Sequence, residues 1–244
     1  MLSPMEKHQL KQYCENDPTL NLLIHRLEES HRMDLSRISH EIRNPVTLIN
    51  SFLQLTLSHH PEVTSFDTWK PIIENMEYLK QLLSELSDYN NSMVLHKEQF
   101  SLSSFLSSLI QECETVFPLL KVSFQKKTAV PPACFDKTKL RAAILNLIRN
   151  ASEALENQPN GEIIVSLSFD GDTFHICVEN NGPEIPSEYL SNLFEPFITH
   201  KKDGTGLGLA IVHNIVQAHE GSINVTSSSE KTSFILHLPL SYET

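Results

Sequence analysis

The sequence lacks any long uncharged apolar run. Nothing in its 244 residues approaches the roughly 20 apolar residues that a membrane-spanning helix needs. The first twenty residues also lack the apolar centre of a signal peptide, because charged side chains interrupt them at Glu6, Lys7, Lys11, Glu15 and Asp17. We therefore expect a cytoplasmic protein with no membrane span.

Basic side chains are scarce as well. Nineteen Lys and Arg residues stand against thirty Asp and Glu residues, giving a formal net charge of -11. Nucleic acids and anionic membrane surfaces are bound mainly through clusters of Lys and Arg, so this balance disfavours both partners. A bound nucleotide stays compatible with it, because backbone amides, a helix terminus and one or two lysines can hold phosphates.

Cysteine is equally sparse, and the spacing of the cysteines does not indicate a metal site. Cys14, Cys113, Cys134 and Cys177 lie too far apart for a zinc-binding or redox pair. We expect them to be reduced and mostly buried thiols.

Two long helical patterns fill the first half of the chain. Apolar residues recur at helical spacing from Pro18 onward (Leu20, Ile24, Leu27, Leu35, Ile38, Ile42, Ile49, Phe52) and again between Asp67 and Met93 (Ile72, Met76, Leu79, Leu83, Leu86). The pattern predicts an antiparallel helical hairpin with one apolar seam on each helix. Such a hairpin cannot enclose a core alone, so we expect a homodimeric four-helix bundle.

One histidine on the first helix has a chemically suggestive setting. At about 100° per residue, His40 points roughly 160° away from Ile38 and Ile42, which we take as the packed side. Glu41 flanks it, and Asn44 lies one turn further along. These side chains could serve a nucleophilic histidine, or they could form an ordinary solvated helix face.

In the second half of the chain, shorter helical patterns alternate with strand patterns. This order predicts a layered α/β domain. Helices are expected at 101–114, 136–154, 187–193 and about 209–218, and strands at 121–126, 162–168, 173–179, 222–227 and 233–238. The fold class is therefore α+β, with the helical hairpin followed by an α/β sandwich that has helices on one face of a mixed sheet.

Two stretches of this half suit a nucleotide. Asn146 and Asn150 share one face of the helix at 136–154 and could reach a magnesium ion or a phosphate, although a plain polar face explains them too. The alternating glycines Gly204, Gly206 and Gly208 run into a helix and would bring backbone amides to an anion; a flexible turn is the alternative. The pattern is neither a Rossmann fingerprint nor a P-loop.

Taken together, the motifs resemble those of two-component sensor histidine kinases. His40 to Pro45 is similar to the H-box, Asn146 to Ala151 to the N-box, Val178 to Ile185 to the G1 box, Phe194 to Phe197 to the F-box and Gly204 to Leu209 to the G2 box. The resemblance covers about residues 30 to 240, and it is closest to short-lid kinases of the sporulation and nitrogen-regulation types.

The resemblance implies a domain plan and roles for the hairpin. It implies an N-terminal tail and helical extension (1–30), a dimerisation and phosphotransfer hairpin (31–97) and a catalytic ATP-binding domain (98–244). By similarity, His40 is the phosphoacceptor, Glu41 the general base, and Asn44 the residue that positions water for dephosphorylating a response regulator receiver domain.

It also implies ATP and Mg²⁺ as cofactors. Asn150 would ligate Mg²⁺, and the other residues implied at the ATP site are Asn146, Asn180, Gly182, Lys201, Lys202, Gly204, Gly206, Leu207, Gly208 and Thr232. Two positions depart from the family pattern Asp-x-Gly-x-Gly. Asn180 replaces the aspartate that accepts from adenine, and Glu184 replaces a glycine, adding bulk and charge near the nucleotide loop.

The resemblance predicts an ATP-dependent protein-histidine kinase that phosphorylates His40 and then a response regulator, and that could also dephosphorylate the regulator. The rival is a non-enzymatic dimeric phosphotransfer or docking module with a degenerate ATP site. A serine kinase or other ATPase on the same fold leaves the hairpin with His40 unexplained. The input signal has to come from a separate sensor protein, a short coiled-coil extension or sequence beyond this chain.

Overall fold

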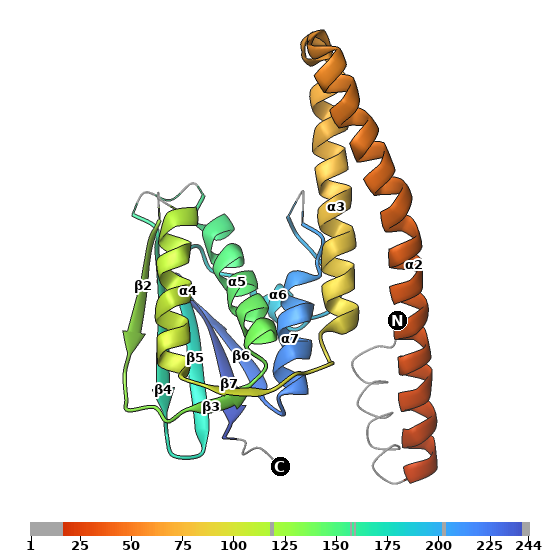
Figure 1. Cartoon of the computed structure of the whole chain (residues 1–244). Helices are drawn as coiled ribbons and strands as arrows, with labels where there is room; N and C mark the ends of the chain where they lie inside the picture. The colour runs from red at the N-terminus through yellow and green to blue at the C-terminus, as the bar shows by residue number, and fades with distance from the viewer. Residues whose placement is uncertain (1–16, 118–119, 157, 159, 202–203, 241–244) are drawn as a thin grey trace. The chain divides into compact units, whose positions relative to one another are not determined.

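The computed structural model describes residues 17–117, 120–156, 158, 160–201 and 204–240 (Figure 1). The chain divides into two compact units, residues 1–90 and 91–244, and each is described by itself. The predicted boundary after residue 97 falls in the link between the last helix of the hairpin and the first strand.

The first unit is a helical hairpin, as predicted. Helix α2 (Pro18–His59) is capped by Asp17, whose carboxylate accepts from the amides of Thr19 and Leu20 at 2.9 and 3.1 Å. A short 3-10 helix, η1 (Pro61–Ser65), leads to α3 (Trp69–Asn91). Helix α2 continues through Pro45.

The seam between the two helices contains residues predicted on α3 but not those predicted on α2. Within this chain the buried cluster consists of Val46, Met76 and Leu83, with Leu53 and Leu79 packed against it. The residues predicted to form the packed side of α2 are exposed by 39% to 49% (Leu35, Ile38, Ile42, Ile49). Met76, Leu79 and Leu83 were predicted on the α3 seam and are confirmed there, whereas on α2 it is Val46 and Leu53 that α3 contacts.

The second unit is built on a five-stranded mixed sheet in the order β2-β4-β5-β7-β6. Its strands are β2 (Lys121–Lys126), β4 (Glu162–Phe169), β5 (Thr173–Asn180), β6 (Ser222–Ser227) and β7 (Thr232–Pro239). Only β2 and β4 pair in parallel. A second sheet, β1 (Glu98–Phe100) with β3 (Ala133–Phe135), was missed, because three-residue strands are too short to show alternation.

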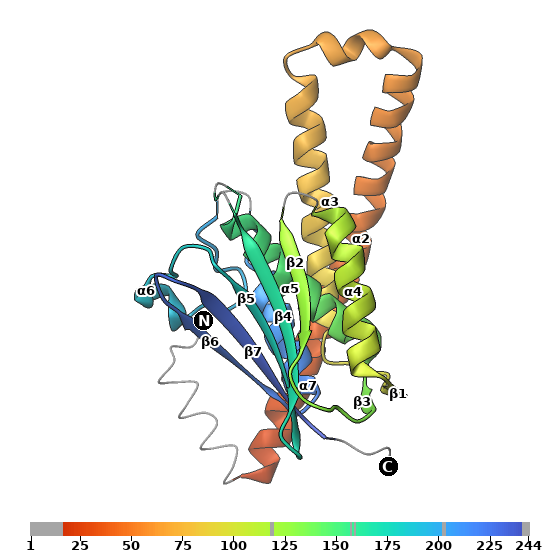
Figure 2. The ribbon, with the colours of Figure 1, turned by 90° about the vertical axis from the view of Figure 1, so that its left-hand side faces the viewer.

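Three helices cover one face of the large sheet (Figures 1 and 2). They are α4 (Leu102–Val116), α5 (Lys137–Ala154) and α7 (Gly208–Ala218), and a single-turn helix, α6 (Ser187–Leu190), precedes α7 in the chain. The sheet meets them with fully buried residues from its three central strands, including Ile163, Val165, Phe174, Ile176 and Leu236. The α/β sandwich is therefore confirmed, with all of its longer helices on one side.

Other expectations can be compared with the described residues. Cys113, Cys134 and Cys177 are in no disulfide bond, and the first two are buried, while Cys14 lies outside the described residues. None of the helices in the described part of the chain is long and apolar enough to cross a membrane.

Candidate phosphoacceptor and nucleotide sites

The turn around His40 has one buried and one exposed side. Ser39 is 1% exposed and donates a hydrogen bond to the carbonyl of Leu35 at 2.7 Å. Arg43 reaches the carbonyl of Leu83 on α3 at 3.4 Å. His40, one residue after Ser39, is exposed, so its imidazole is open to a reagent in solution.

The two side chains predicted to assist His40 are exposed as well. The carboxylate of Glu41 accepts from Arg37 at 3.0 Å, one turn earlier on the same helix. Asn44 lies four residues beyond His40 and is also open to solvent. These neighbours come to His40 through helical spacing alone.

In the second unit, α5 presents two different faces. Asp136 caps the helix by accepting from the amide of Lys139 at 2.9 Å. Leu147 and Ile148 are fully buried against the sheet, whereas Asn146 and Asn150 are half-buried. The helix thus holds its two asparagine amides at the edge of the core, where they are restrained but still reachable.

A lysine from the segment before the glycines reaches this face. The Lys201 ammonium donates to the Asn150 side-chain oxygen at 3.0 Å and forms an ion pair with Glu153. Lys201 therefore bonds to the oxygen that the family resemblance assigns to Mg²⁺. Lys202, the other predicted lysine, lies outside the described residues.

The start of α7 lies beside Asn146, and together they form a candidate nucleotide corner. Leu207, the residue before the helix, makes no side-chain capping bond, so the first amides of the helix stay available. A Cβ atom on Gly208 would lie 3.3 Å from the Asn146 oxygen, so the two elements approach closely. Free amides at a helix N-terminus suit a phosphate.

Gly206 ties the glycine loop to the segment before it. The amide of Phe197 donates to the Gly206 carbonyl at 3.0 Å, and Gly206 has a φ of 70°. A Cβ atom there would lie 2.7 Å from the backbone of Phe197 and Ile198. Near Gly204 the Thr199 side chain takes up the space instead, and its hydroxyl accepts from the amide of Lys201 at 3.2 Å.

The end of β5 holds the remaining predicted residues. Asn180 is 4% exposed and pairs in register with Thr232, which is 3% exposed. The amide nitrogen of Asn180 lies 2.6 Å from where a Cβ of Gly182 would be, and it has no hydrogen-bond partner among the described residues. Glu184, which the sequence placed in the nucleotide loop, is exposed.

These features fit ATP and Mg²⁺. The buried amide of Asn180 lacks a partner, the start of α7 offers free amides, and Asn150 provides a neutral oxygen of the kind that Mg²⁺ accepts. The described residues contain no cluster of three or more His, Cys, Asp or Glu side chains able to hold a metal. A magnesium ion would therefore be held by Asn150 together with the phosphates.

Two sets of side-chain contacts in the second unit were not anticipated. Tyr189 of α6 stacks on His200 with ring centroids 3.5 Å apart, next to Lys201. His219 is 2% exposed; it accepts from the amide of Asp136 at 3.0 Å and donates to the Ile215 carbonyl at 2.8 Å. Neither contact follows a periodic pattern, so helical and strand spacing give no signal for them.

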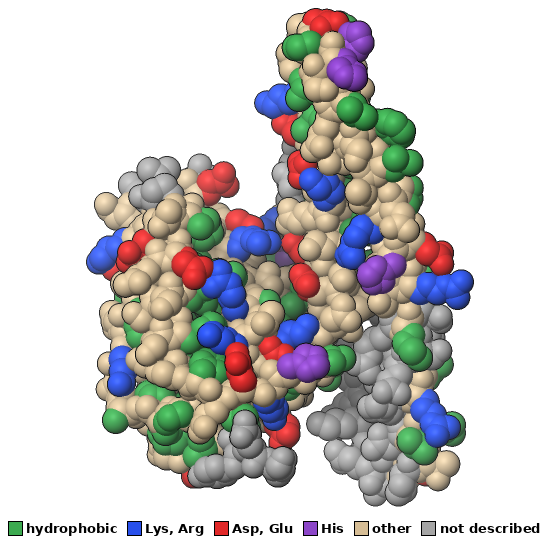
Figure 3. Space-filling view, in the orientation of Figure 1, with side chains coloured by type: hydrophobic (Ala, Val, Ile, Leu, Met, Phe, Trp, Pro, Cys, Tyr) green, Lys and Arg blue, Asp and Glu red, His purple; other side chains and the backbone are tan. Residues whose placement is uncertain are grey.

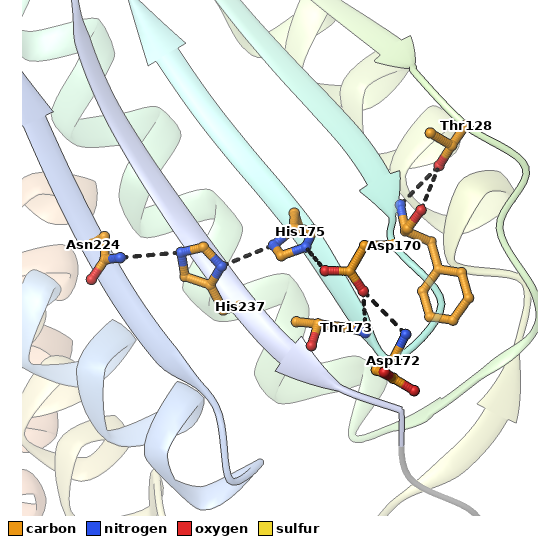
Figure 4. A network of polar contacts seen from close by, with 8 residues as sticks. Thr128, Asp170, Asp172, Thr173, His175, Asn224 and His237 are labelled. Atoms are coloured by element: carbon orange, nitrogen blue, oxygen red, sulfur yellow. Dashed lines mark hydrogen bonds and ion pairs between the residues drawn. The ribbon is translucent and has the colours of Figure 1, made fainter.

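A separate polar network lies on the sheet strands away from the predicted site residues (Figure 4). Asp170 contacts His175 at 2.8 Å, His175 contacts His237 at 2.8 Å, and His237 contacts Asn224 at 3.3 Å. The hydrogen bond from His175, with backbone amides, lowers the pKa of Asp170 to about 2. One proton order satisfies the chain, with every donor pointing from Asn224 toward Asp170.

The fold and this corner define a class of ATP-binding domain. Residues 135–242 match the family described as histidine kinase-, DNA gyrase B- and HSP90-like ATPase. That range contains Asn146, Asn150, Asn180 and the three glycines. Residues 135–242 thus form a domain of this ATPase family, and the chain as a whole is similar to two-component sensor histidine kinases.

Two curated relatives illustrate the similarity. Sporulation kinase B of Bacillus subtilis (strain 168) is 27% identical over 235 residues, covering 94% of this chain and 55% of that protein. The sensory histidine kinase/phosphatase NtrB of Rhizobium meliloti (strain 1021) is 29% identical over 222 residues, covering 84% of this chain and 58% of the relative. The chain thus spans about half the length of these relatives.

A solved structure matches both units of the chain. The histidine kinase ThkA, crystallised in complex with the response regulator protein TrrA, aligns with a TM-score of 0.63 and 26% identity. The alignment covers 95% of this chain and 66% of ThkA. The prediction of the family from five short motifs is therefore confirmed.

Proposed function

We propose that the chain is a protein-histidine kinase that transfers the γ-phosphoryl group of ATP to His40 and then to an aspartate of a response regulator receiver domain. One observation carries the proposal. A chain of this family combines an exposed His40 with a nucleotide corner in which Asn150, Lys201 and the start of α7 converge. The ThkA–TrrA complex supports a response regulator as the partner.

Phosphoryl transfer to His40 requires an unprotonated ring nitrogen. A neutral imidazole attacks the γ-phosphorus with its unprotonated nitrogen; the N–P bond forms while the bond to the ADP oxygen breaks. Glu41 accepts the proton from the other ring nitrogen, exchanging its bond to Arg37 for one to the ring. Lys201 would exchange its bond to the Asn150 oxygen for the phosphates, which the α7 amides would also bind, and Asn150 would then hold the metal. When bound, Mg²⁺ would neutralise negative charge on the phosphates.

The exposed stripe on α2 supports a homodimer formed through the hairpin. Leu35, Ile38, Ile42 and Ile49 form a row of large apolar side chains exposed by 39% to 49%, and Phe52 continues it at 57%. Figure 3 shows hydrophobic side chains reaching the surface along the hairpin. A second copy would bury this stripe in a four-helix bundle. We place this dimer in the cytoplasm, where a separate sensor protein would supply the signal.

The test is autophosphorylation with γ-labelled ATP and Mg²⁺. We expect label that is acid-labile and base-stable, and that is lost in His40→Ala and in Asn150→Ala. His59→Ala is the matched control, because His59 is an exposed histidine in the last turn of the same helix. It should label like the unmodified protein.

Two outcomes would contradict the proposal. Acid-stable label would indicate a serine or threonine acceptor. A folded dimer with no label at all would favour the rival, a phosphotransfer or docking module whose ATP site has decayed.

A second activity, removal of the phosphoryl group from the regulator, is favoured by the position of Asn44. Its amide is exposed one turn from His40 and could orient a water molecule. The name of NtrB, a kinase/phosphatase, supports this candidate. A regulator loaded by a small phosphodonor should lose phosphate faster with the unmodified chain than with Asn44→Ala. Equal rates would remove Asn44 from this role.

A further inference from the structure

The polar pair at the end of β5 and β7 interrupts an otherwise apolar surface. Along β5 the residues that face the helices are Phe174, Ile176 and Val178, each at most 1% exposed, and the next one is Asn180. Thr232 lies opposite Asn180 in register on β7. A buried polar pair at the edge of a core needs partners that the core cannot supply.

Among the described residues at this corner, the Asn180 side-chain amide is the one with an unpaired nitrogen. The Thr232 hydroxyl is hydrogen-bonded to Ser227 at 2.6 Å. The neighbouring Asn181 uses both ends of its amide, accepting from the Glu162 amide at 2.8 Å and donating to a loop carbonyl at 3.0 Å. The Asn180 nitrogen has no partner within the described part of the chain, although it is buried. It is therefore the group that a ligand would satisfy.

Gly182 keeps this amide in place. A Cβ atom at Gly182 would lie 2.6 Å from the Asn180 nitrogen and 3.3 Å from the side chain of Ala154, at the end of α5. Because Gly182 has no side chain, the Asn180 amide can lie beside α5. This helix also carries Asn150. A ligand held at Asn150 by its phosphates would turn its other end toward Asn180.

An amide side chain has a property that a carboxylate lacks. It presents an acceptor and a donor side by side, and rotation by 180° exchanges them. Adenine offers a 6-amino donor next to the N1 acceptor, whereas hypoxanthine and guanine offer a 6-oxo acceptor next to an N1–H donor. An amide can match either edge, while a carboxylate only accepts and repels a 6-oxo group.

We propose that Asn180 reads the six-position edge of a purine base and accepts 6-oxopurines as well as adenine, so that the site binds ITP in addition to ATP. The inference rests on the proposed function, because it takes a purine nucleoside triphosphate as the ligand. ITP is the sharpest probe, since it differs from ATP only at the edge that Asn180 would contact.

The experiment measures the Kd of ATP and of ITP, each with Mg²⁺, by calorimetry on the full chain. For the unmodified protein we expect the two values to agree within about 3-fold. Asn180→Asp should weaken ITP binding and raise the ratio above about 10-fold, because the carboxylate faces the 6-oxo group. Asn224→Asp is the control for added charge, since Asn224 belongs to the separate network on β6, and it should keep the ratio of the unmodified protein.

Four results would overturn the inference. A preference for ATP above 10-fold that is unchanged in Asn180→Asp would mean that Asn180 does not select the base. Failure of the unmodified chain to bind either nucleotide would also refute it. Label on His40 from ATP without measurable ITP binding would refute the inference and leave the kinase proposal standing. If the protein neither binds a nucleotide nor becomes labelled, the inference and the kinase proposal are both refuted.

Discussion

The hairpin and the ATP-binding unit place their chemical groups in opposite ways. In the hairpin, His40, Glu41 and Asn44 are exposed on one helix, and nothing but helical spacing holds them together. In the second unit, Asn150, Asn180 and Lys201 come from a helix, a strand end and a loop, and they are buried or tied to one another. The polar groups of the hairpin are therefore open to solvent, whereas those of the second unit are restrained by their surroundings.

The largest expected difference between the two units lies in their cores. Leu147→Ala removes a fully buried side chain of α5 and should cost the second unit about 2–5 kcal/mol of unfolding free energy. Ile42→Ala trims a side chain that is 42% exposed in this chain, so it should leave that unfolding transition unchanged and weaken self-association instead. Urea unfolding and sedimentation measure the two effects. An equal loss of unfolding free energy in the two variants would contradict this difference between the units.

The next largest effect concerns the glycine loop. Gly206→Ala combines a left-handed φ of 70° with a Cβ atom 2.7 Å from backbone atoms, so the loop has to move. We expect at least a 10-fold loss of ATP affinity and about 1–3 kcal/mol of stability. Gly171→Ala is the control, because its φ of 116° is also unfavourable but no atom lies within 4 Å of the added Cβ. An equal effect of both would exclude the close contact as the cause.

Acidification should weaken the second unit through His219. Burial lowers the pKa of this histidine below its ordinary value of 6.5, more than its bond to Ile215 raises it. The unfolded chain therefore binds the proton more readily than the folded one. Stability is fully present above about pH 6.5 and declines as pH falls through that value, by at most about 1.4 kcal/mol per pH unit. Unfolding of His219→Gln, followed over the same range, should have a shallower slope.

A smaller effect is expected from Lys201, which is half exposed in its contact with Asn150 and Glu153. Lys201→Ala should lower affinity for ATP about 3- to 10-fold with little change in stability, since such exposed pairs contribute about 1 kcal/mol or less. Binding of adenosine, which has no phosphates, is the control and should not change. A loss of adenosine binding would mean that Lys201 shapes the pocket rather than holding phosphates.

The smallest effect should come from the hairpin surface. Arg37 and Glu41 form an ion pair whose side chains are 80% and 66% exposed. Arg37→Ala should change stability by at most about 0.5 kcal/mol. It should also free Glu41, so the labelling rate of His40 should rise or stay within about 2-fold. A marked drop in that rate would show that Arg37, not Glu41, supports the reaction.

The sequence predicted most of the elements because their signals are local. The helix expected at 136–154, the strand expected at 121–126 and the exposure of His40 each depend on residues close together in the sequence, and all are found. Spacing on α2 did not indicate which apolar residues α3 covers: α3 packs on Val46 and Leu53, and the predicted row stays exposed in the single chain. Lys201 and Glu153 lie 48 residues apart, and their pairing follows from folding rather than from spacing.

The unbroken course of α2 has a mechanical consequence. Helix α2 has 42 residues and α3 has 23, so a long section of α2 extends past its partner. At about 1.5 Å per residue, Pro18 and His40 are about 33 Å apart along one hydrogen-bonded rod. A rotation of the helix about its axis near Pro18 therefore turns the imidazole of His40 through a similar angle. No residue between them has to change its conformation.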